Sequence, residues 1–399
     1  MSLLQNSERG IKKTKESDKI MIEQKTTNQE TFVMKTITET IGGGQALLDI
    51  NFNLQACFEE CLNDEYKMFL QLLRVAEEYL PLYIRPQKKT GRPPYPYFPF
   101  IRSMLGKMFF GVEKTSNFIQ RLKGEPNLRL LCGFEKVPDA STFSRNFEYL
   151  AKENIWSPAL DELVKRSHEG KVVYHISRDS TMIRAREKVP VKTEKKVEKP
   201  KKRRGRPCKN EIKPRKEPTT LEKQVSEDAT ISIQQINKNC AWGCKKNSQG
   251  NIETTKGYKL HLDVSDIGFP ITAVITGANV HDSQLAIPME KITERKVTFC
   301  YSLMDSAYDA KIIDEYIRSR EHIPIIDPNK RKNKDRPPLD PAKQERYKIR
   351  TTVERANAHL KENLIPKNLY VKGYTKVSFV LMASVLCLAI IKYLQYFVS

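Results

Sequence analysis

Hydrophobic and polar residues follow two different patterns along the chain, and each pattern predicts its own kind of structure. Residues 46–170 carry apolar side chains at helical spacing, as in Met68–Leu73 and Phe100–Leu105, so we expect a helical block. Residues 172–364 instead hold short β-branched and aromatic runs separated by amphipathic segments. The expected order of three strands, helix, strand, helix, strand and helix describes an α/β protein with a mixed sheet and flanking helices.

The strand runs are short and bounded by turn residues. They are residues 172–178, 258–264, 271–275, 298–304 and 323–326. Asp266–Gly268 is the expected hairpin turn, and helices are expected near 284–293 and 309–320, followed by a helix carrying Glu354. A final apolar run of 13 residues, Phe379–Ile391, is short for a membrane span, and we interpret it as a buried helix.

The helical block is expected to be interrupted and capped at identifiable places. Thr90–Pro96 contains a glycine and three prolines and predicts a stiff loop. Ser141 or Thr142 is expected to cap the helix that carries Phe143. Short helices joined by tight turns suit a helix-turn-helix DNA reader, and they suit equally a helical bundle that does not read bases.

Composition changes this picture by indicating a polyanionic partner. The chain of 399 residues has a formal net charge of +21 and a pI of about 9.5. Residues 187–216 alone hold 14 Lys or Arg against 4 Glu. The eight cysteines show no disulfide framework, and the polar N-terminus lacks an apolar signal core, so we expect no secretion. Cys240 and Cys244 are either half of a zinc site or unrelated thiols.

Candidate chemistry comes from three acids. Asp179 and Asp305 each follow a predicted strand, and Glu354 lies on the late helix. At about 100° per residue, Glu354 shares a roughly 60° arc of that helix with Tyr347, Arg350 and Lys361. The alternatives are a solvated helix face with ion pairs, and aspartates that serve only as turn formers or caps. Three converging carboxylates would suit a two-metal centre acting on phosphodiesters.

Several motifs together resemble a known family. The spacing Tyr347-x2-Arg350-x3-Glu354-x6-Lys361 is similar to the Y-R-E-K signature of bacterial insertion-sequence transposases of the DDE type. Four further stretches also resemble that family, and the resemblance runs from about residue 80 to 395. They are Pro138–Arg145, Gly257–His261, Ala278–Asp282 and Met304–Asp309.

The resemblance implies a ribonuclease H-like fold preceded by an α-helical DNA-binding domain. Its first and fourth strands would lie side by side and bring Asp179 and Asp305 together. Asp179, Asp305 and Glu354 would be the catalytic acids and the ligands of two Mg²⁺ ions, for which Mn²⁺ could substitute. Tyr347, Arg350 and Lys361 would position DNA phosphates.

The implied activity is binding of double-stranded DNA at terminal inverted repeats, Mg²⁺-dependent cleavage, and joining of the 3′-hydroxyl to target DNA by transesterification. The resemblance also implies a homodimer on paired ends and a bacterial cytoplasmic, nucleoid-associated protein without a membrane partner. The alternatives are a nuclease of the same fold without strand transfer, and a non-enzymatic DNA-binding protein derived from a transposase.

The expected domains follow from these patterns. Residues 1–45 are predicted to be a disordered tail and 46–170 the helical DNA-binding domain. Residues 171–186 and 256–399 would form the catalytic domain, and 187–255 a basic flexible insertion. That insertion contains a run resembling an AT-hook, and its alternative is a basic linker that contacts phosphates non-specifically. Its candidate DNA-binding residues are Lys201, Lys202, Arg203, Arg204 and Arg206.

Two further positions have open interpretations. Trp242, in the run Trp242-Gly243-Cys244-Lys245, either stacks on an unpaired base or packs against the sheet. His281 and Asp282 follow a strand, and they either touch the rim of the metal site or form a hydrogen-bonded turn.

Overall fold

A computed structural model of the chain describes residues 58–80, 95–190, 218–246, 249–329 and 338–398. The chain divides into two compact units, one within 1–107 and 115–147 and the other within 108–114 and 148–399. The predicted tail, the AT-hook run and the Thr90–Pro94 part of the predicted loop lie outside the described residues.

The described part of residues 58–153 is helical, as the spacing of its apolar residues predicts. Its helices are α3 (Asp64–Tyr79), α4 (Phe98–Phe109), α5 (Thr115–Gly124), α6 (Pro126–Leu131) and α7 (Ala140–Glu153). Aromatic rings fill the core of the first unit, where Phe143 lies edge-on to Phe100 with ring centroids 5.1 Å apart.

The predicted cap of α7 is wrong by two residues. The helix begins at Ala140, so Ser141 and Thr142 lie in its first turn. The carbonyl of Asp139 already accepts from the backbone amides of Thr142 (2.9 Å) and Phe143 (3.2 Å). Asp139 therefore occupies the cap position, where the side chain of a short acidic residue is also favoured.

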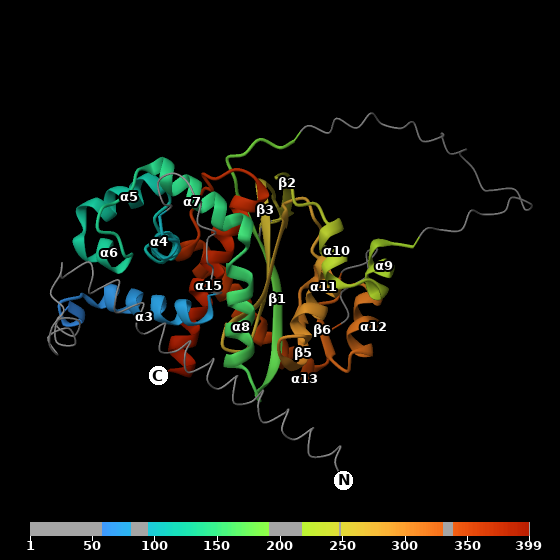
Figure 1. Ribbon diagram of the computed structural model, residues 1–399. Coiled ribbons are helices and arrows are strands. Elements are labelled where there is room, and N and C mark those ends of the chain that lie inside the picture. Colours follow the sequence, from blue (N-terminus) through green and yellow to red (C-terminus); the bar gives the residue numbers. More distant parts are fainter. Residues whose placement is uncertain (1–57, 81–94, 191–217, 247–248, 330–337, 399) are drawn as a thin grey trace, which may run out of the picture. The chain divides into compact units, whose positions relative to one another are not determined.

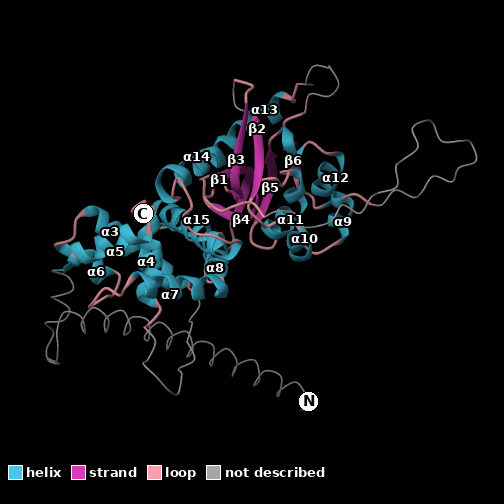
Figure 2. Cartoon of the chain, turned by 90° about the horizontal axis from the view of Figure 1, so that it is seen from above, coloured by secondary structure: helices cyan, strands magenta, loops and turns pink. Residues whose placement is uncertain are grey.

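The second unit is built on a mixed sheet of six strands (Figures 1 and 2). They are β1 (Val172–Arg184), β2 (Ala241–Lys246), β3 (Ile252–Val264), β4 (Pro270–Gly277), β5 (Thr298–Met304) and β6 (Ile323–Ile326). The order is β2-β3-β1-β5-β6, and β4 pairs with β3 beyond the end of β2. β1 pairs in parallel with β5, which confirms the predicted neighbourhood of the first and fourth expected strands.

β1 is longer than its predicted span. Asp179 was expected just after the strand, but it lies inside β1, opposite Leu262 of β3. The strand continues because Ser180–Arg184 keep the antiparallel ladder to β3, in register from Ser180↔His261 to Arg184↔Gly257. Pairing with β5 stops at Ser177↔Leu303, so Asp179 has a strand partner on only one side.

The span 187–255 is not uniformly a flexible insertion. Its described residues contain two helices, α9 (Thr220–Ser226) and α10 (Ala229–Gln235), and strand β2. Thr219 caps α9 with a capping box, and Asp228 caps α10, so local polar residues define these elements. Gly243 of β2 allows a close strand approach, because a Cβ there would lie 2.2 Å from the carbonyl oxygen of Ala278.

Helices cover both faces of the sheet (Figures 1 and 2). One face carries α9, α10, α11 (Ser283–Glu294) and α12 (Lys311–Ser319). The other carries α8 (Trp156–Ser167), α14 (Thr351–His359) and α15 (Tyr374–Phe397). Neighbouring residues of β1 therefore point into different layers, because strand side chains alternate between faces.

The late helix is segmented rather than regular. It consists of α13 (Pro341–Tyr347), a 3₁₀ turn η2 (Lys348–Arg350), α14, and a π-helical turn η3 (Leu360–Leu364). One side of this segment packs into the core, since Val353, Ala356 and Leu360 are buried, whereas Ile349 is half-buried. A uniform 100° spacing is incorrect, however, because the 3₁₀ and π turns change the rotation per residue around Lys361 and Tyr347.

The final helix α15 is longer than the predicted 13-residue run and is mostly buried. Among the described residues it is the one helix long and apolar enough to cross a membrane, and 72% of its most apolar window is buried. Trp156 of α8 packs on Phe379 with ring centroids 5.3 Å apart. Such burial is typical of a core helix.

Candidate active site

Asp179 and Asp305 lie where the two central parallel strands diverge. The last β1–β5 pair is Ser177↔Leu303, so Asp179 and Asp305 each follow it by two residues. The side chain of Asp305 caps η1 (Ser306–Tyr308) by accepting from the amide of Ala307 at 3.0 Å. Asp305 Oδ1 therefore acts as a helix cap, as one of the two interpretations of this residue expected. Asp305 Oδ2 has no hydrogen-bond partner among the described residues.

Arg350 joins the strand acid to the helix acid. Its Nη1 donates to Glu354 Oε1 at 2.5 Å, and its Nη2 donates to Asp179 Oδ1 at 3.4 Å. The Arg350 and Asp179 side chains are each 15% exposed, whereas Glu354 is 53% exposed. Glu354 is thus held at the rim of the site by a residue one helical turn away.

Asn357 orients the other oxygen of Asp179. Its Nδ2 donates to Asp179 Oδ2 at 3.1 Å. Asn357 lies seven residues after Arg350, which is two helical turns, so both side chains reach the same strand residue. Two buried atoms beside this carboxylate, Arg350 Nε and Asn357 Oδ1, have no hydrogen-bond partner among the described residues.

Burial makes this pair of aspartates costly as anions. Desolvation raises the pKa of Asp179, and the charge of Asp305 raises it further, while Arg350 opposes both effects. Desolvation likewise raises the pKa of Asp305, against the lowering effect of Arg350. A site of this kind favours either a proton or a cation between the carboxylates.

Cations and an aromatic ring surround the acids. The Tyr347 ring centroid lies 6.0 Å from the Arg350 guanidinium carbon, and burial raises the pKa of Tyr347 to about 12. Lys361 is exposed, yet partial desolvation by its neighbours lowers its pKa, and the nearby charge of Lys245 lowers it further. Lys245 in turn lowers the pKa of Asp179. These charges make the rim of the site electropositive.

Arg178 belongs to a different cluster on the opposite face of β1. Its guanidinium is 1% exposed and donates through Nε and Nη2 to the two oxygens of Asp263, at 2.7 and 2.8 Å. It also donates to Glu290 Oε2 at 3.1 Å and to the carbonyl of Ala286 at 2.8 Å. This bidentate, fully buried arrangement ties β1, β3 and α11 together behind Asp179.

The two polar residues that end the Ala278–Asp282 motif have different roles: His281 forms a turn and Asp282 forms an ion pair. His281 is exposed, and its Nδ1 lies 2.8 Å from Ser283 Oγ, which agrees with the hydrogen-bonded turn. Asp282 accepts from Lys259 Nζ at 2.8 Å. His261 Nδ1 lies 3.8 Å from Asp282, but burial lowers the pKa of His261 to about 3, so this histidine is neutral.

Within the described residues, no three His, Cys, Asp or Glu side chains are close enough together to hold a metal ion.

Cys240 is buried with its thiol 3.9 Å from the carbonyl of Glu187, and Cys244 is exposed on β2 beside Thr254. Trp242 is 56% exposed, so its ring does not pack into the sheet.

The sequence-predicted residues of the described region gather in one place. The charges of Asp179, Asp305, Tyr347 and Glu354 all act on Arg350, and that of Asp179 acts on Lys361. Lys201, Lys202, Arg203, Arg204 and Arg206 lie outside the described residues. The sequence analysis missed Asn357, although it lies two helical turns after Arg350. It also missed that the charge of Lys245, in the Trp242–Lys245 run, acts on Asp179 and Lys361.

Comparison with known proteins gives the family. The chain matches a family model described as Transposase DDE domain over residues 174–390 and one described as Transposase domain (DUF772) over residues 60–149. No curated protein and no solved structure matches it.

The first match covers more than half of the 399 residues, so the chain belongs to the insertion-sequence transposases of the DDE type. Its mixed sheet with flanking helices is the ribonuclease H-like α/β fold. The chain is therefore a DNA-processing enzyme of a family that generally uses divalent metal ions.

Proposed function

We propose that this transposase binds the terminal inverted repeats of its element, cleaves the DNA with Mg²⁺ and joins the 3′-hydroxyl ends to target DNA. Asp179, Asp305 and Glu354 are the proposed catalytic acids. The observation that carries the proposal is the meeting of Asp179 and Glu354 on one guanidinium, that of Arg350, beside the carboxylate of Asp305.

The chemistry of the three acids suits a divalent cation, although in the described structure no three His, Cys, Asp or Glu side chains lie close enough together to hold one. Carboxylate oxygens are the ligands that Mg²⁺ prefers, and the raised pKa values of Asp179 and Asp305 reflect two anions that lack solvation. Glu354 is more than half exposed, so it can exchange Arg350 for a cation at little cost. Two bound ions, Mg²⁺ or Mn²⁺, would activate an oxygen nucleophile and stabilise the leaving oxygen.

The remaining side chains have distinct proposed roles. Arg350 holds Asp179 and Glu354 in place, and Asn357 fixes the second oxygen of Asp179. Tyr347, Arg350 and Lys361 position the phosphates of the DNA, as the Y-R-E-K signature implies. Lys245 adds positive charge on the same rim.

Two displacements at phosphorus account for the reaction. In cleavage, a water oxygen attacks the phosphorus and gives a proton to solvent or to a carboxylate, while the 3′-oxygen of the element end leaves and takes up a proton. In joining, the freed 3′-hydroxyl loses its proton and attacks a target phosphodiester, and the expelled target 3′-oxygen takes up a proton. Neither step requires a covalent bond between enzyme and DNA.

The wider organisation is part of the same proposal. The helical region 46–170 would bind the terminal repeats, and residues 171–186 and 256–399 would carry the chemistry. We also propose a homodimer on paired ends and a bacterial cytoplasmic, nucleoid-associated location. A same-fold nuclease would cut without joining, so strand transfer discriminates between the two activities.

The test compares cleavage and end binding on the same DNA with Mg²⁺. Asp179→Ala, Asp305→Ala and Glu354→Ala should each abolish cleavage and leave gel shifts of the terminal repeats largely intact, because the acids serve the chemical step. Asp314→Ala is the control, an exposed acid paired with Arg318 on α12. A variant that still cleaves at more than a few per cent of wild type removes that acid from the site.

A further inference from the structure

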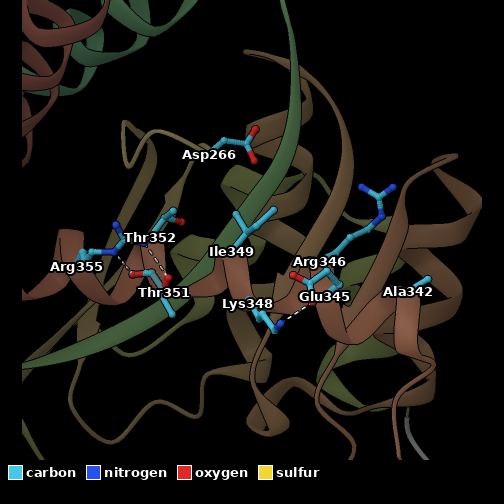
Figure 3. A pocket seen from close by; sticks show the side chains of 9 residues that line it. All are labelled: Asp266, Ala342, Glu345, Arg346, Lys348, Ile349, Thr351, Thr352 and Arg355. Atoms are coloured by element: carbon cyan, nitrogen blue, oxygen red, sulfur yellow. Dashed lines mark hydrogen bonds and ion pairs between the residues drawn. The ribbon is translucent and has the colours of Figure 1, made fainter.

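An open hollow is lined by residues of the helical segment that also carries Arg350 and Glu354, together with Asp266 (Figure 3). It has a volume of about 760 Å³, and neither of these two residues lines it. Its polar lining includes Asp266, Glu345, Arg346, Lys348, Thr351 and Arg355. We name this cavity the α13–α14 groove.

The cationic lining follows the helical repeat. Lys348, Thr351 and Arg355 are spaced by three and four residues, so they lie along one side of the helix. Arg355 donates through Nη2 to Thr351 Oγ1 at 3.0 Å and through Nε to the Thr351 carbonyl at 3.4 Å. These bonds orient its guanidinium beside a hydroxyl, the kind of donor pair that contacts phosphate oxygens.

The charges of the groove are unevenly paired. Asp266 is engaged, since it accepts from the His175 ring at 2.7 Å and from the amides of Tyr174 and His175. Among the described residues Glu345 pairs with Lys348, and both side chains are at least two-thirds exposed, so that pair separates at little cost. Arg346 and Arg355 make no ion pair with any described carboxylate.

Arg346 is nonetheless fixed in position. Its guanidinium carbon lies 4.4 Å from the centroid of the Tyr301 ring, and its Nη1 lies 3.4 Å from His175 Nε2. His175 and Tyr301 are themselves stacked, with centroids 5.0 Å apart. A cation that is held by rings and not neutralised by any described acid is suited to an anionic ligand.

We propose that the α13–α14 groove binds the sugar–phosphate backbone of target DNA. Besides Asp266 and Glu345, its lining offers cations and threonine hydroxyls, which are the groups that contact phosphate oxygens. Element ends need sequence recognition, whereas a target strand has only to be held near the catalytic acids. The assignment rests on the proposed strand-transfer function.

The test uses the full chain with Lys348→Ala and Arg355→Ala combined. The matched control is Lys311→Ala with Arg318→Ala on α12, which removes two exposed cations elsewhere. Binding is measured at several salt concentrations on a duplex that lacks the terminal repeat. The groove variant should bind more weakly than the control variant, with the slope of log K against log salt flatter by about 0.9 for each lost phosphate contact.

A strand-transfer assay distinguishes binding of target DNA from binding of the element ends. With pre-cleaved element ends, the groove variant should need several-fold more target plasmid for half-maximal joining, while end cleavage and end binding match the control. Duplex binding equal to that of the control overturns the groove, and so does a loss confined to end binding. If wild type cuts and joins nothing, the proposed function fails, while the duplex-binding comparison still reports on the groove.

Discussion

Arg178 and Asp179 are neighbours on β1, yet their surroundings differ in kind. Arg178 faces α11 with its donors directed to Asp263, Glu290 and the carbonyl of Ala286. Asp179 faces α14, beside Arg350 Nε and Asn357 Oδ1, two buried atoms without a hydrogen-bond partner in the described part of the chain. Buried polar groups are normally satisfied, so the exceptions need an explanation. The difference lies in the charges, because the fold itself neutralises Arg178 on the α11 face, whereas Asp179 on the α14 face remains open to a ligand; buried atoms without a described partner occur on both faces, with His261 Nδ1 on the α11 face.

Arg178→Ala should be the most damaging change. It leaves Asp263 and Glu290 as buried carboxylates without their cation, so the free energy of unfolding should fall by about 3–5 kcal/mol. Urea unfolding followed by the fluorescence of the buried Trp156 measures it. Arg318→Ala, which breaks an exposed pair, should cost at most about 1 kcal/mol. Equal small losses in both variants would show that the Arg178 cluster is not a structural anchor.

The α11 face should also be the acid-sensitive one. Burial lowers the pKa of His261 from 6.5 to about 3, so the folded state keeps it neutral while the unfolded state takes up a proton below pH 6.5. Its contribution is therefore complete above pH 6.5 and is lost as pH falls, by about 1.4 kcal/mol per pH unit. Unfolding curves of wild type and His261→Gln between pH 7 and pH 5 should converge as the pH falls.

The control for this pH effect is His281→Gln, because His281 is exposed. It should keep the full pH dependence of wild type. If wild type and His261→Gln show parallel pH dependences, the proton uptake has been assigned to the wrong histidine.

The opposite face should respond to loss of charge by becoming more stable. Asp179→Asn and Asp305→Asn remove anions whose pKa values are raised by burial, so each should stabilise the metal-free protein by about 0.5–2 kcal/mol. Thermal unfolding in EDTA and in Mg²⁺ checks this. Mg²⁺ should raise the Tm of wild type and not that of the double variant. Destabilised Asn variants would mean that these acids are structural.

Lys361→Ala should have the smallest effect on stability, less than about 0.5 kcal/mol, because the residue is exposed. Strand transfer should nevertheless weaken, since a phosphate contact on the electropositive rim is lost. The measurement is the rate of joining by Lys361→Ala and by wild type, at a temperature where both proteins are fully folded. Unchanged transfer would return Lys361 to an ordinary solvated helix face.

Local patterns predicted most of the sheet. The content of β-branched and aromatic residues predicted the β5 strand and the hairpin around Asp266, and the family resemblance implied that β1 and β5 are neighbours. The end of β1 could not be predicted from its own residues, because Ser180–Arg184 remain in the strand through pairing with β3, about 80 positions away in sequence. The elements within 187–255 were missed because the adjoining basic run dominates the composition there.

The site was predicted in outline and not in its contacts. Helical spacing grouped Arg350 with Glu354 correctly, but it could not show that Arg350 also reaches Asp179. Arg178 passed unnoticed because a single charged residue at a strand end gives no sign of its distant partners Asp263 and Glu290. The π turn at Leu360–Leu364 shows why a uniform helical wheel misplaces Lys361.

The most direct test of the catalytic assignment is joining of a pre-cleaved element end to plasmid DNA in Mg²⁺, compared between Glu354→Gln and Glu315→Gln. The two glutamates are matched, since each is over half exposed and paired with a cation four residues away. We predict that Glu354→Gln gives no joined product while Glu315→Gln joins at the wild-type rate. Equal joining by both variants would contradict the assignment of Glu354 as a catalytic acid.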